Sequence, residues 1–208
     1  MVPARAFATT PSGTPKPGLR ERKKIKTRRA IRRAAYRLFE ELGYEATPVG
    51  RIAEAADVSL STFFRYFPTK EDIVLTDEYD ALLEAGIRAR PHDEPVVDSL
   101  RHGALAALRE LAGQDRTDLR RRGRLIRDVP AIRGRTAEMT ARDTATISAI
   151  LAERTGRPAD DLHLRVIGAA AVAGLQEALL HWAEDGCTTR LEDLIHQTMD
   201  VLARGLTV

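Results

Sequence analysis

The sequence predicts an all-α fold, and three observations lead to that prediction. Apolar residues recur three and four positions apart in one segment after another, which is the spacing of one helix face. Several of these segments end at helix breakers, of which Pro91, Gly156, Pro158 and Gly186 are examples. No run alternates apolar and polar residues in the way that a half-buried strand does. We therefore expect a helical chain with about nine helices.

The first part of the chain is basic. Residues 1–18 are rich in Pro, Ala, Thr and Gly, and we expect them to form a disordered tail. Between residues 16 and 37 the only acid is Glu21, among many lysines and arginines. Because the formal net charge of the 208 residues is only +3, the rest of the chain is net acidic. A basic amino-terminal segment on an otherwise acidic chain suits a phosphate-binding site at that end of the protein.

Residues 47–70 predict two short helices joined by a tight turn. The first carries an apolar stripe at helical spacing, with Thr47 as its cap and Pro48 in its first position. Ser59 is expected to cap the second helix, over residues 60–67. This is the pattern of a helix-turn-helix, whose second helix fits the major groove of DNA. The segment therefore predicts a DNA-binding regulator.

The second of these helices is expected to turn Phe63 and Phe67 inward and to expose its other side chains. Leu60 can contact a thymine methyl group, while hydroxyl and basic side chains suit phosphate oxygens. The predicted DNA contacts are Arg28, Thr47, Arg51, Leu60, Ser61, Thr62, Phe64, Arg65, Tyr66 and Lys70. The alternative is a plain helical hairpin with scattered surface aromatic residues.

Residues 30–72 resemble the tetracycline-repressor (TetR) family of transcriptional regulators. The most specific part of the resemblance is the run TFFRYFPTKED at residues 62–72. Two positions depart from the family pattern. Asp57 stands where the turn often has glycine, so the backbone there must adopt a left-handed conformation. Gly50 stands where many members have a polar residue, which weakens the expectation that the first helix of the motif reads bases.

The resemblance implies two domains. Residues 19–70 would be a three-helix helix-turn-helix DNA-binding domain, and residues 71–208 a larger helical ligand-binding and dimerisation domain. Within the second, Thr69 and Asp72 suggest a capping box that opens a helix running to about Arg90. Further helices are expected near residues 95–112, 117–127, 131–155, 160–185 and 189–204.

The helix expected at residues 160–185 is apolar on nearly every side, because small residues fill its middle. Such a helix must be buried on several faces, one of which can pack on a second copy of the chain. Its predicted dimer contacts are Gly168, Ala171, Gly174 and Leu175. TetR relatives use their last two long helices in this way, and two recognition helices related by a twofold axis can read a palindrome. The alternative is the central helix of a monomer.

Three residues are candidates for the wall of an effector pocket. His102, Gln176 and Trp182 are polar or amphipathic residues inside otherwise apolar helices. Each of them also fits an ordinary core or boundary position.

The arginine-dense stretch of residues 116–135 adds Arg120 and Arg124 to these candidates. Its layout resembles a TetR branch that binds acyl-CoA-like ligands, in which arginines would hold the phosphates of coenzyme A. The same arginines also fit a solvated helix face with Glu138, Asp143 and Glu153 as partners.

The function expected from the sequence is a ligand-responsive repressor. It would bind a palindromic DNA operator as a homodimer and be released by a small-molecule effector such as an acyl-CoA. An architectural DNA-binding protein without a ligand response is the first alternative, and an all-α enzyme is the second.

The enzyme alternative lacks the usual sequence motifs. The five histidines show no paired metal-ligand spacing, and neither a phosphate-binding loop nor a GxSxG motif is present. We therefore predict no catalytic residue, no metal and no cofactor. Neither a signal sequence nor a membrane-spanning stretch is expected, and Cys187 has no second cysteine to pair with. A cytoplasmic location is the simplest expectation.

Overall fold

The computed structural model describes residues 18–76, 79–112 and 116–205, and every regular element in these ranges is a helix. The tail expected at residues 1–18 lies outside the described residues, apart from Gly18. The helices are α1 (Leu19–Leu42), α2 (Val49–Ala55), α3 (Leu60–Tyr66), α4 (Asp72–Leu75), α5 (Tyr79–Arg88), α6 (Val96–Ala112), α7 (Arg116–Asp128), α8 (Pro130–Thr155), α9 (Leu162–Glu184) and α10 (Leu191–Ala203).

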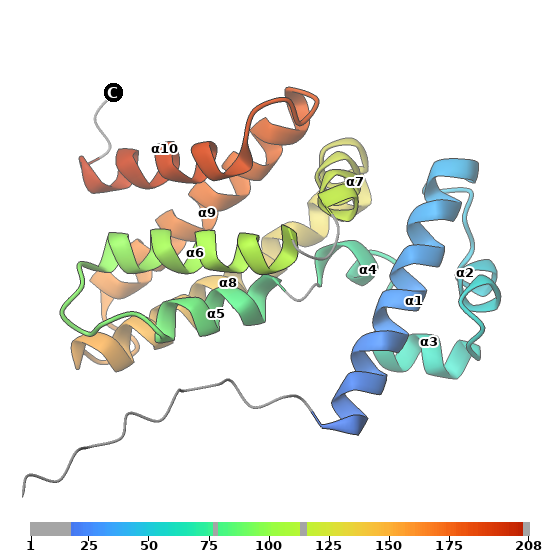
Figure 1. Ribbon diagram of the computed structural model, residues 1–208, viewed down its shortest axis with the longest axis horizontal. Helices are drawn as coiled ribbons and strands as arrows, with labels where there is room; N and C mark the ends of the chain where they lie inside the picture. Colours follow the sequence, from blue (N-terminus) through green and yellow to red (C-terminus); the bar gives the residue numbers. More distant parts are fainter. Residues whose placement is uncertain (1–17, 77–78, 113–115, 206–208) are drawn as a thin grey trace, which may run out of the picture.

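The helices form two groups with α4 between them (Figure 1). Helices α1 to α3 form one end of the molecule, and α5 to α10 form a bundle that makes up the rest. Within the bundle α5 packs on α6, α8 packs on α9, and α10 packs on both α9 and α6. Short α4 contacts α1 on one side and α7 and α8 on the other.

Each group has its own hydrophobic core. The core of the bundle is built from α5, α6, α8, α9 and α10, and it includes Leu100, Leu151 and Trp182. The core of the amino-terminal group includes Ile31 and Phe63, and it also takes in residues of α4 and of the junction between α7 and α8. The two groups are therefore joined by apolar packing around α4.

The local features of the helix-turn-helix agree with the sequence in three respects. Ser59 caps α3, since its hydroxyl oxygen accepts a hydrogen bond from the Thr62 backbone N–H at 3.1 Å. Asp57 has a φ of 53°, so the left-handed turn expected at this position is confirmed. The inward placement of Phe63 and Phe67 is also confirmed, because both side chains are fully buried.

The cap predicted for α2 is wrong. Pro48 occupies the capping position, and no side chain caps this helix. The Thr47 hydroxyl donates instead to the carbonyl oxygens of Leu38 and Gly43, at 3.2 and 2.7 Å. Thr47 therefore satisfies the carboxyl end of α1, where carbonyl groups have no partner within the helix.

The capping box of Thr69 and Asp72 is confirmed, because each backbone N–H donates to the other side chain, at 2.9 and 3.3 Å. The long helix expected after it is wrong. The chain leaves the helical conformation at Thr76, whose φ and ψ of −102° and 107° are extended. Helix α4 is therefore only four residues long, and α5 begins separately.

Helix α9 is long and apolar enough to cross a membrane by length and composition, although we expected no such stretch from the sequence. In the structure it packs on α7, α8 and α10, and Leu164, Val172 and Trp182 are buried. A central helix of a bundle needs the same composition as a membrane span. Packing inside the protein therefore accounts for the apolar residues on the inward faces of α9.

Helices α5 and α6 approach each other most closely at Gly86 and Gly103. A Cβ atom at Gly103 would lie 2.5 Å from Cγ1 and 3.0 Å from the backbone nitrogen of Ile87, a fully buried residue. A Cβ atom at Gly86 would lie 2.9 Å from the Gly103 carbonyl oxygen. Only glycine at these positions allows the two backbones to come this close.

Gly103→Ala should therefore lower the free energy of unfolding by about 1 to 3 kcal/mol, because the added methyl group forces α5 and α6 apart. Gly134→Ala in α8 is the matched control, since its Cβ would meet no atom within 4 Å. That change should raise the free energy of unfolding by about 0.5 to 1 kcal/mol through helix propensity. Denaturant unfolding of both variants measures the contrast, and equal effects would contradict the close packing.

Candidate functional site

Helix α3 has two faces of opposite character. Phe63 and Phe67 are buried in the core, whereas Leu60 and Phe64 are 51% and 49% exposed. Ser61 and Arg65 are also exposed. A short helix with apolar and polar side chains turned to solvent is able to meet the edges of base pairs.

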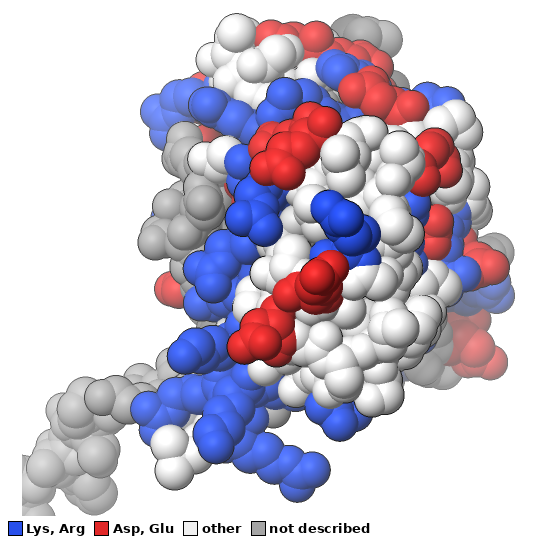
Figure 2. All heavy atoms as spheres, turned by 90° about the vertical axis from the view of Figure 1, so that its right-hand side faces the viewer, with Lys and Arg blue, Asp and Glu red and all other residues white. Residues whose placement is uncertain are grey.

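Basic side chains flank this helix. The exposed lysines and arginines of α1 are Arg20, Arg22, Lys23, Lys24, Lys26, Arg33 and Arg37. Figure 2 shows Lys and Arg gathered along one side and at the lower edge of this end of the molecule. The start of α1 and helix α3 lie at the same lower edge in Figure 1. The exposed face of α3 is therefore bordered by positive charge, which suits a polyanion.

Three of the predicted DNA contacts are placed elsewhere. Thr47 is fully buried, so its side chain cannot reach DNA. The Lys70 ammonium donates to the carbonyl oxygens of Tyr44 and Thr47 at 2.8 and 3.3 Å and lies 4.1 Å from the centre of the Tyr44 ring. Arg28 donates to the Thr76 hydroxyl at 3.1 Å and lies over the Phe67 ring. These side chains hold the helix-turn-helix together instead of extending from its surface.

The other predicted contacts remain at or near the surface. Arg51 is exposed on α2. Thr62 and Tyr66 are half-buried, and the Arg65 guanidinium lies 5.3 Å from the centre of the Tyr66 ring. The Thr62 hydroxyl accepts a hydrogen bond from the Ser59 hydroxyl, so its position is fixed by the cap of α3. The contacts of Arg51 and of the α3 residues with DNA stay predictions.

A cavity of about 130 Å³ lies within the bundle. Leucine, isoleucine and valine side chains of α5 to α10 form most of its wall, among them Leu83, Leu119 and Ile147. The remaining lining residues are polar or charged: Tyr79, Asp80, Glu84, Arg122, Asp143, Thr146 and Gln176. An apolar cavity with a few polar groups is the usual form of a small-molecule site.

Three charged residues of this wall, Asp80, Asp143 and Arg122, have perturbed pKa values. Burial raises the pKa of Asp80 to about 7, and the neighbouring carboxylates of Asp143 and Glu84 contribute to the rise. Burial also raises the pKa of Asp143 and lowers the pKa of the Arg122 guanidinium. Groups with pKa values shifted in this way are typical of functional sites.

Helix α4 connects this cavity to the helix-turn-helix. On one side Arg32 of α1 donates to the Ile73 carbonyl oxygen at 3.1 Å and also to the Thr76 carbonyl oxygen. On the other side Arg122, which lines the cavity, donates to the Leu75 carbonyl oxygen at 3.4 Å. Arg135 of α8 lies 3.5 Å from the Asp72 carboxylate. Arginines from three helices therefore hold the same short helix.

Of the predicted effector-site residues, only Gln176 lines this cavity, and its amide donates to the Thr140 hydroxyl at 2.8 Å. Trp182 and Arg120 line a second hollow of about 110 Å³ beside the turn between α9 and α10. The indole N–H of Trp182 donates to the Thr189 carbonyl oxygen at 2.9 Å. Arg124 is exposed and lies 4.0 Å from Glu40 of α1. The structure therefore does not bring the five residues together.

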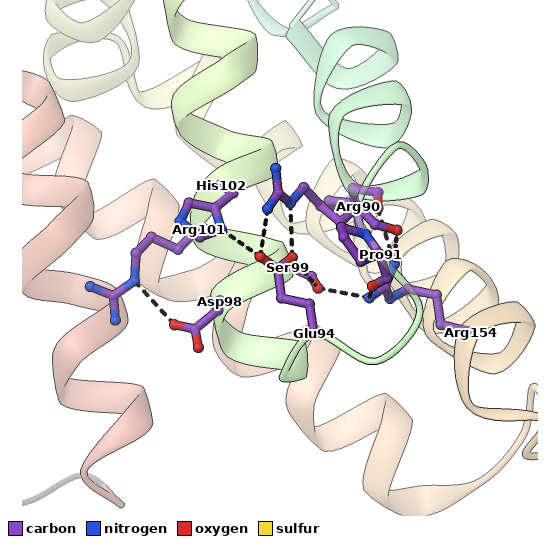
Figure 3. Close-up of polar contacts among 9 residues, drawn as sticks. Arg90, Pro91, Glu94, Asp98, Ser99, Arg101, His102 and Arg154 are labelled. Atoms are coloured by element: carbon purple, nitrogen blue, oxygen red, sulfur yellow. Dashed lines mark hydrogen bonds and ion pairs between the residues drawn. The ribbon is translucent and has the colours of Figure 1, made fainter. Parts of the chain in front are cut away.

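His102 lies outside both hollows, in a polar network between α5 and α6 (Figure 3). Its ring nitrogen Nδ1 lies 2.9 Å from the Glu94 carboxylate, which also accepts hydrogen bonds from Arg90 and Ser99. The bonds from Arg90 chiefly lower the pKa of Glu94, to about 2. Arg154 of α8 joins the network through the Arg90 and Pro91 carbonyl oxygens. His102 is therefore part of a network that fixes the turn between these helices.

The arginines at residues 116–135 are mostly held by the protein itself. Arg121 makes a bidentate pair with Glu40 of α1, at 2.8 and 3.0 Å. Arg127 pairs with Asp128 at 2.6 Å. Arg135 pairs with Asp72 and with Glu138, both at 3.5 Å. Of the partners expected for a solvated helix face, Glu138 fills this role, but Glu153 pairs with Arg88 of α5.

Sequence reasoning missed the acidic groups of the cavity. Asp80 and Glu84 lie one helical turn apart on α5 and flank the cavity residue Leu83. Carboxylates beside an apolar stripe were the available signal, although such residues usually face solvent. Asp143 joins them from α8, and Arg122 joins them from α7. Neither of these two could be assigned to the same site without the fold.

The predicted dimer contacts on α9 point into the chain's own fold. A Cβ atom at Gly168 would lie 2.9 Å from the Ser148 hydroxyl of α8, and one at Gly174 would lie 2.8 Å from Thr198 of α10. Ala171 is buried, and Leu175 lines the cavity. The four residues therefore face the chain's own fold, where small side chains allow α9 to pack closely on its neighbours.

The outward face of the same helix is apolar. Leu162 and Val166 are 69% and 57% exposed, and Ala169 and Ala173 continue the stripe at helical spacing. Val201 of α10 is also exposed. An apolar stripe on two adjacent helices is a candidate surface for a second copy of the chain.

Comparison with known proteins covers both parts of the chain. Residues 94–207 match the MftR C-terminal domain family, and residues 31–76 match the family described as bacterial regulatory proteins, tetR family. The chain is 34% identical over 160 residues to the HTH-type transcriptional regulator TcmR of Streptomyces glaucescens. That alignment covers 74% of this chain and 70% of TcmR.

Solved structures of similar fold include two transcriptional regulators. Thermus thermophilus FadR, a TetR-family transcriptional repressor solved with lauroyl-CoA, has a TM-score of 0.54 and 28% identity, covering 87% of this chain and 95% of that one. FadR of Bacillus subtilis, solved with stearoyl-CoA, has a TM-score of 0.59 and 21% identity, covering 86% and 99%, and this similarity shows the fold alone. With family matches over residues 31–76 and 94–207 and a 34% identical relative aligned over 70% of its length, the chain belongs to the TetR family of DNA-binding transcriptional regulators.

Proposed function

We propose that this regulator is a homodimeric repressor that binds a palindromic operator and is released by a small-molecule effector in the bundle cavity. Residues 19–70 would form the DNA-binding domain and residues 71–208 the effector and dimerisation domain, and the protein would act in the cytoplasm. The observation that carries the proposal is the shared support of α4, which contacts both the helix-turn-helix and a residue of the cavity wall.

Exposed α3 residues support the DNA-binding part of the proposal. Leu60 and Phe64 would contact base edges and methyl groups in the major groove, while Ser61 and Arg65 would add polar contacts. Exposed basic residues of α1 would neutralise phosphates on either side. One such helix reads few base pairs, so two copies are needed for a specific operator.

Dimerisation would use the outward stripe of α9 together with α10. Leu162 and Val166 are more exposed than nearly all other large apolar side chains of the described chain. Covering them in a twofold interface would remove apolar surface from water, which stabilises the assembly. The interface would therefore lie on the side of α9 opposite Gly168 and Gly174.

The effector response would pass through α4. An effector shifts the equilibrium only if it binds the released conformation more tightly than the DNA-binding one. Arg122 lies in the cavity wall and donates to the end of α4, while Arg32 donates to the same end from α1. A ligand that moves Arg122 would therefore change the support of the helix-turn-helix.

An acyl-CoA is one candidate for the effector. It is favoured by Thermus thermophilus FadR, which was solved with lauroyl-CoA. In the present chain, however, Arg121, Arg127 and Arg135 are held by carboxylates of the protein. They would have to leave those partners before they could hold the phosphates of coenzyme A.

Selection of duplexes from a random library tests the DNA-binding proposal, and we expect a palindrome. Leu60→Ala should relax the base preference at its contact position. Lys26→Ala is the contrasting variant, because a phosphate contact should weaken all sequences about equally and reduce the log–log salt slope by about 0.9. Equal affinity for random and selected duplexes would indicate an architectural DNA-binding protein instead of a repressor.

An enzyme activity is the remaining alternative class. Among the described residues no group of three or more His, Cys, Asp and Glu side chains could hold a metal ion. If the purified protein turned over a substrate at a rate unaffected by Phe64→Ala, a regulator would no longer be the best description.

A further inference from the structure

The cavity in the bundle has an unusual balance of charge for an anion-binding site. Among the described residues of its wall, Asp80, Glu84 and Asp143 bring three carboxyl groups and Arg122 brings the single guanidinium. Part of the Arg122 hydrogen-bonding capacity is directed to the Leu75 carbonyl oxygen on α4. The rest of the wall is largely apolar. A ligand that enters therefore meets acidic groups on a hydrophobic surface.

Two of these acids lack a hydrogen-bonded counterion. Within the part of the chain that the structure describes, the carboxylates of Asp80 and Asp143 have no hydrogen bond and no ion pair within 4.0 Å. The charged groups that influence Asp80 come from three helices: Asp143 and Arg142 of α8, Glu84 of α5 and Arg32 of α1. A partly buried carboxylate without a partner has lost some of its hydration, so a cationic ligand would gain from pairing with it.

We propose that the effector of this regulator is an amphipathic cation. Its apolar body would lie against side chains such as Leu83, Leu119 and Ile147, and its ammonium or amidinium group would lie between Asp80 and Asp143. This inference rests on the proposed function, since it names the chemical class of the molecule that would occupy the effector cavity.

The same groups disfavour an anionic head group. A carboxylate or phosphate placed beside Asp80, Glu84 and Asp143 would meet like charges in a water-poor site. Arg121 is bound to Glu40, and Arg142 and Arg32 offset only part of the rise in the pKa of Asp80. Arg120 faces the second hollow and not this cavity.

The titration of Asp80 gives the inference a pH dependence. Burial and the neighbouring acids hold its pKa at about 7, so near neutral pH much of the group is protonated. A cation binds the ionised form, so its affinity should rise as the pH increases from 6 to 8 and a proton should be released on binding. A ligand that binds as an anion should show the opposite trend.

Four probes with the same alkyl chain test the head group on the full-length protein. Decyltrimethylammonium, decanol, decanoate and decanoyl-CoA, all below their micelle concentrations, are compared by titration calorimetry at pH 6 and pH 8. We expect decyltrimethylammonium to bind at least about tenfold more tightly than decanoate, with a larger difference at pH 8. Equal affinities, or tighter binding of either anion, would overturn the inference.

Substitutions in the cavity wall test whether the cationic head group contacts Asp80 and Asp143. The double change Asp80→Asn with Asp143→Asn should weaken binding of decyltrimethylammonium about tenfold and leave decanol unchanged within about twofold. Glu177→Gln on the exposed side of α9 is the matched control, because it removes a carboxylate that does not line the cavity. If both changes weakened the cation equally, general surface charge and not the cavity would hold it.

Release from the selected duplex separates this inference from the proposed function. If the cation binds in the cavity but does not release DNA, the ligand class stands and the effector response is wrong. If decanoyl-CoA releases DNA and the cation does not bind, the effector response stands and the cationic class is wrong.

Discussion

Phe63→Ala should lower the free energy of unfolding by about 3 to 5 kcal/mol, because it removes a fully buried aromatic ring from the amino-terminal core. Phe64→Ala, one position later, should cost less than about 1 kcal/mol, since that ring is 49% exposed and chiefly contacts the edge of Phe63. The two substitutions remove the same chemical group from opposite faces of α3. Comparing the two variants therefore distinguishes the side chain that packs α3 on the core from the side chain on its exposed face.

DNA binding should show a different order of effects. Phe64→Ala should weaken the operator complex while thermal unfolding stays close to that of the parent protein. Phe63→Ala should weaken DNA binding only in proportion to the fraction of protein whose helix-turn-helix is unfolded. Lower temperature should therefore restore part of the DNA affinity. Unfolding curves and duplex titrations on the same samples measure both quantities. Loss of stability in Phe64→Ala as large as in Phe63→Ala would contradict the orientation of α3.

Asp80→Asn should stabilise the protein by about 2 to 4 kcal/mol at pH 8, with little effect at pH 4. The pKa of this carboxyl is about 7 in the folded protein, against a usual value of 3.8. At pH 4 and below, the group is largely protonated in the folded state, and burial costs little. As the pH rises from 4 toward 7, the Asp80 carboxyl ionises in the unfolded chain but stays largely protonated in the folded protein. The free energy of unfolding of the parent protein therefore falls over this range. The amide carries no charge and avoids this loss.

Denaturant unfolding at several pH values measures this difference. Asp193→Asn on the exposed side of α10 is the control, and it should change stability by a similar amount at each pH. The difference in free energy of unfolding between Asp80→Asn and the parent protein should grow from pH 4 to pH 8. If it did not, the burial of this carboxylate in the cavity wall would be contradicted.

Most features that depend on neighbouring residues were predictable from the sequence, although the cap expected at Thr47 was not. The cap at Ser59, the left-handed turn at Asp57 and the capping box of Thr69 and Asp72 each involve residues within a few positions of one another. Their chemistry is local, so it can be derived before the fold is known. The all-α class follows for the same reason, because helical periodicity is a property of each segment alone.

Features that depend on distant residues were not predictable. The break at Thr76 coincides with hydrogen bonds from Arg28 and Arg32, which lie more than forty positions earlier in the chain. The face of α9 that packs inward could not be chosen, because a helix that is apolar on all sides carries no amphipathic signal. The cavity brings Asp80 and Asp143 together from separate helices, and only the tertiary fold creates that proximity.

The position of the aromatic residues gives each half of the molecule its own optical probe. Trp182 is the sole tryptophan and is buried in α9, so indole emission should report the state of the bundle alone. Tyr36, Tyr44 and Tyr66 belong to the helix-turn-helix, and only Tyr79 lies beyond it. Emission and tyrosine absorbance followed together during unfolding should thus reveal whether the two halves melt in one cooperative step.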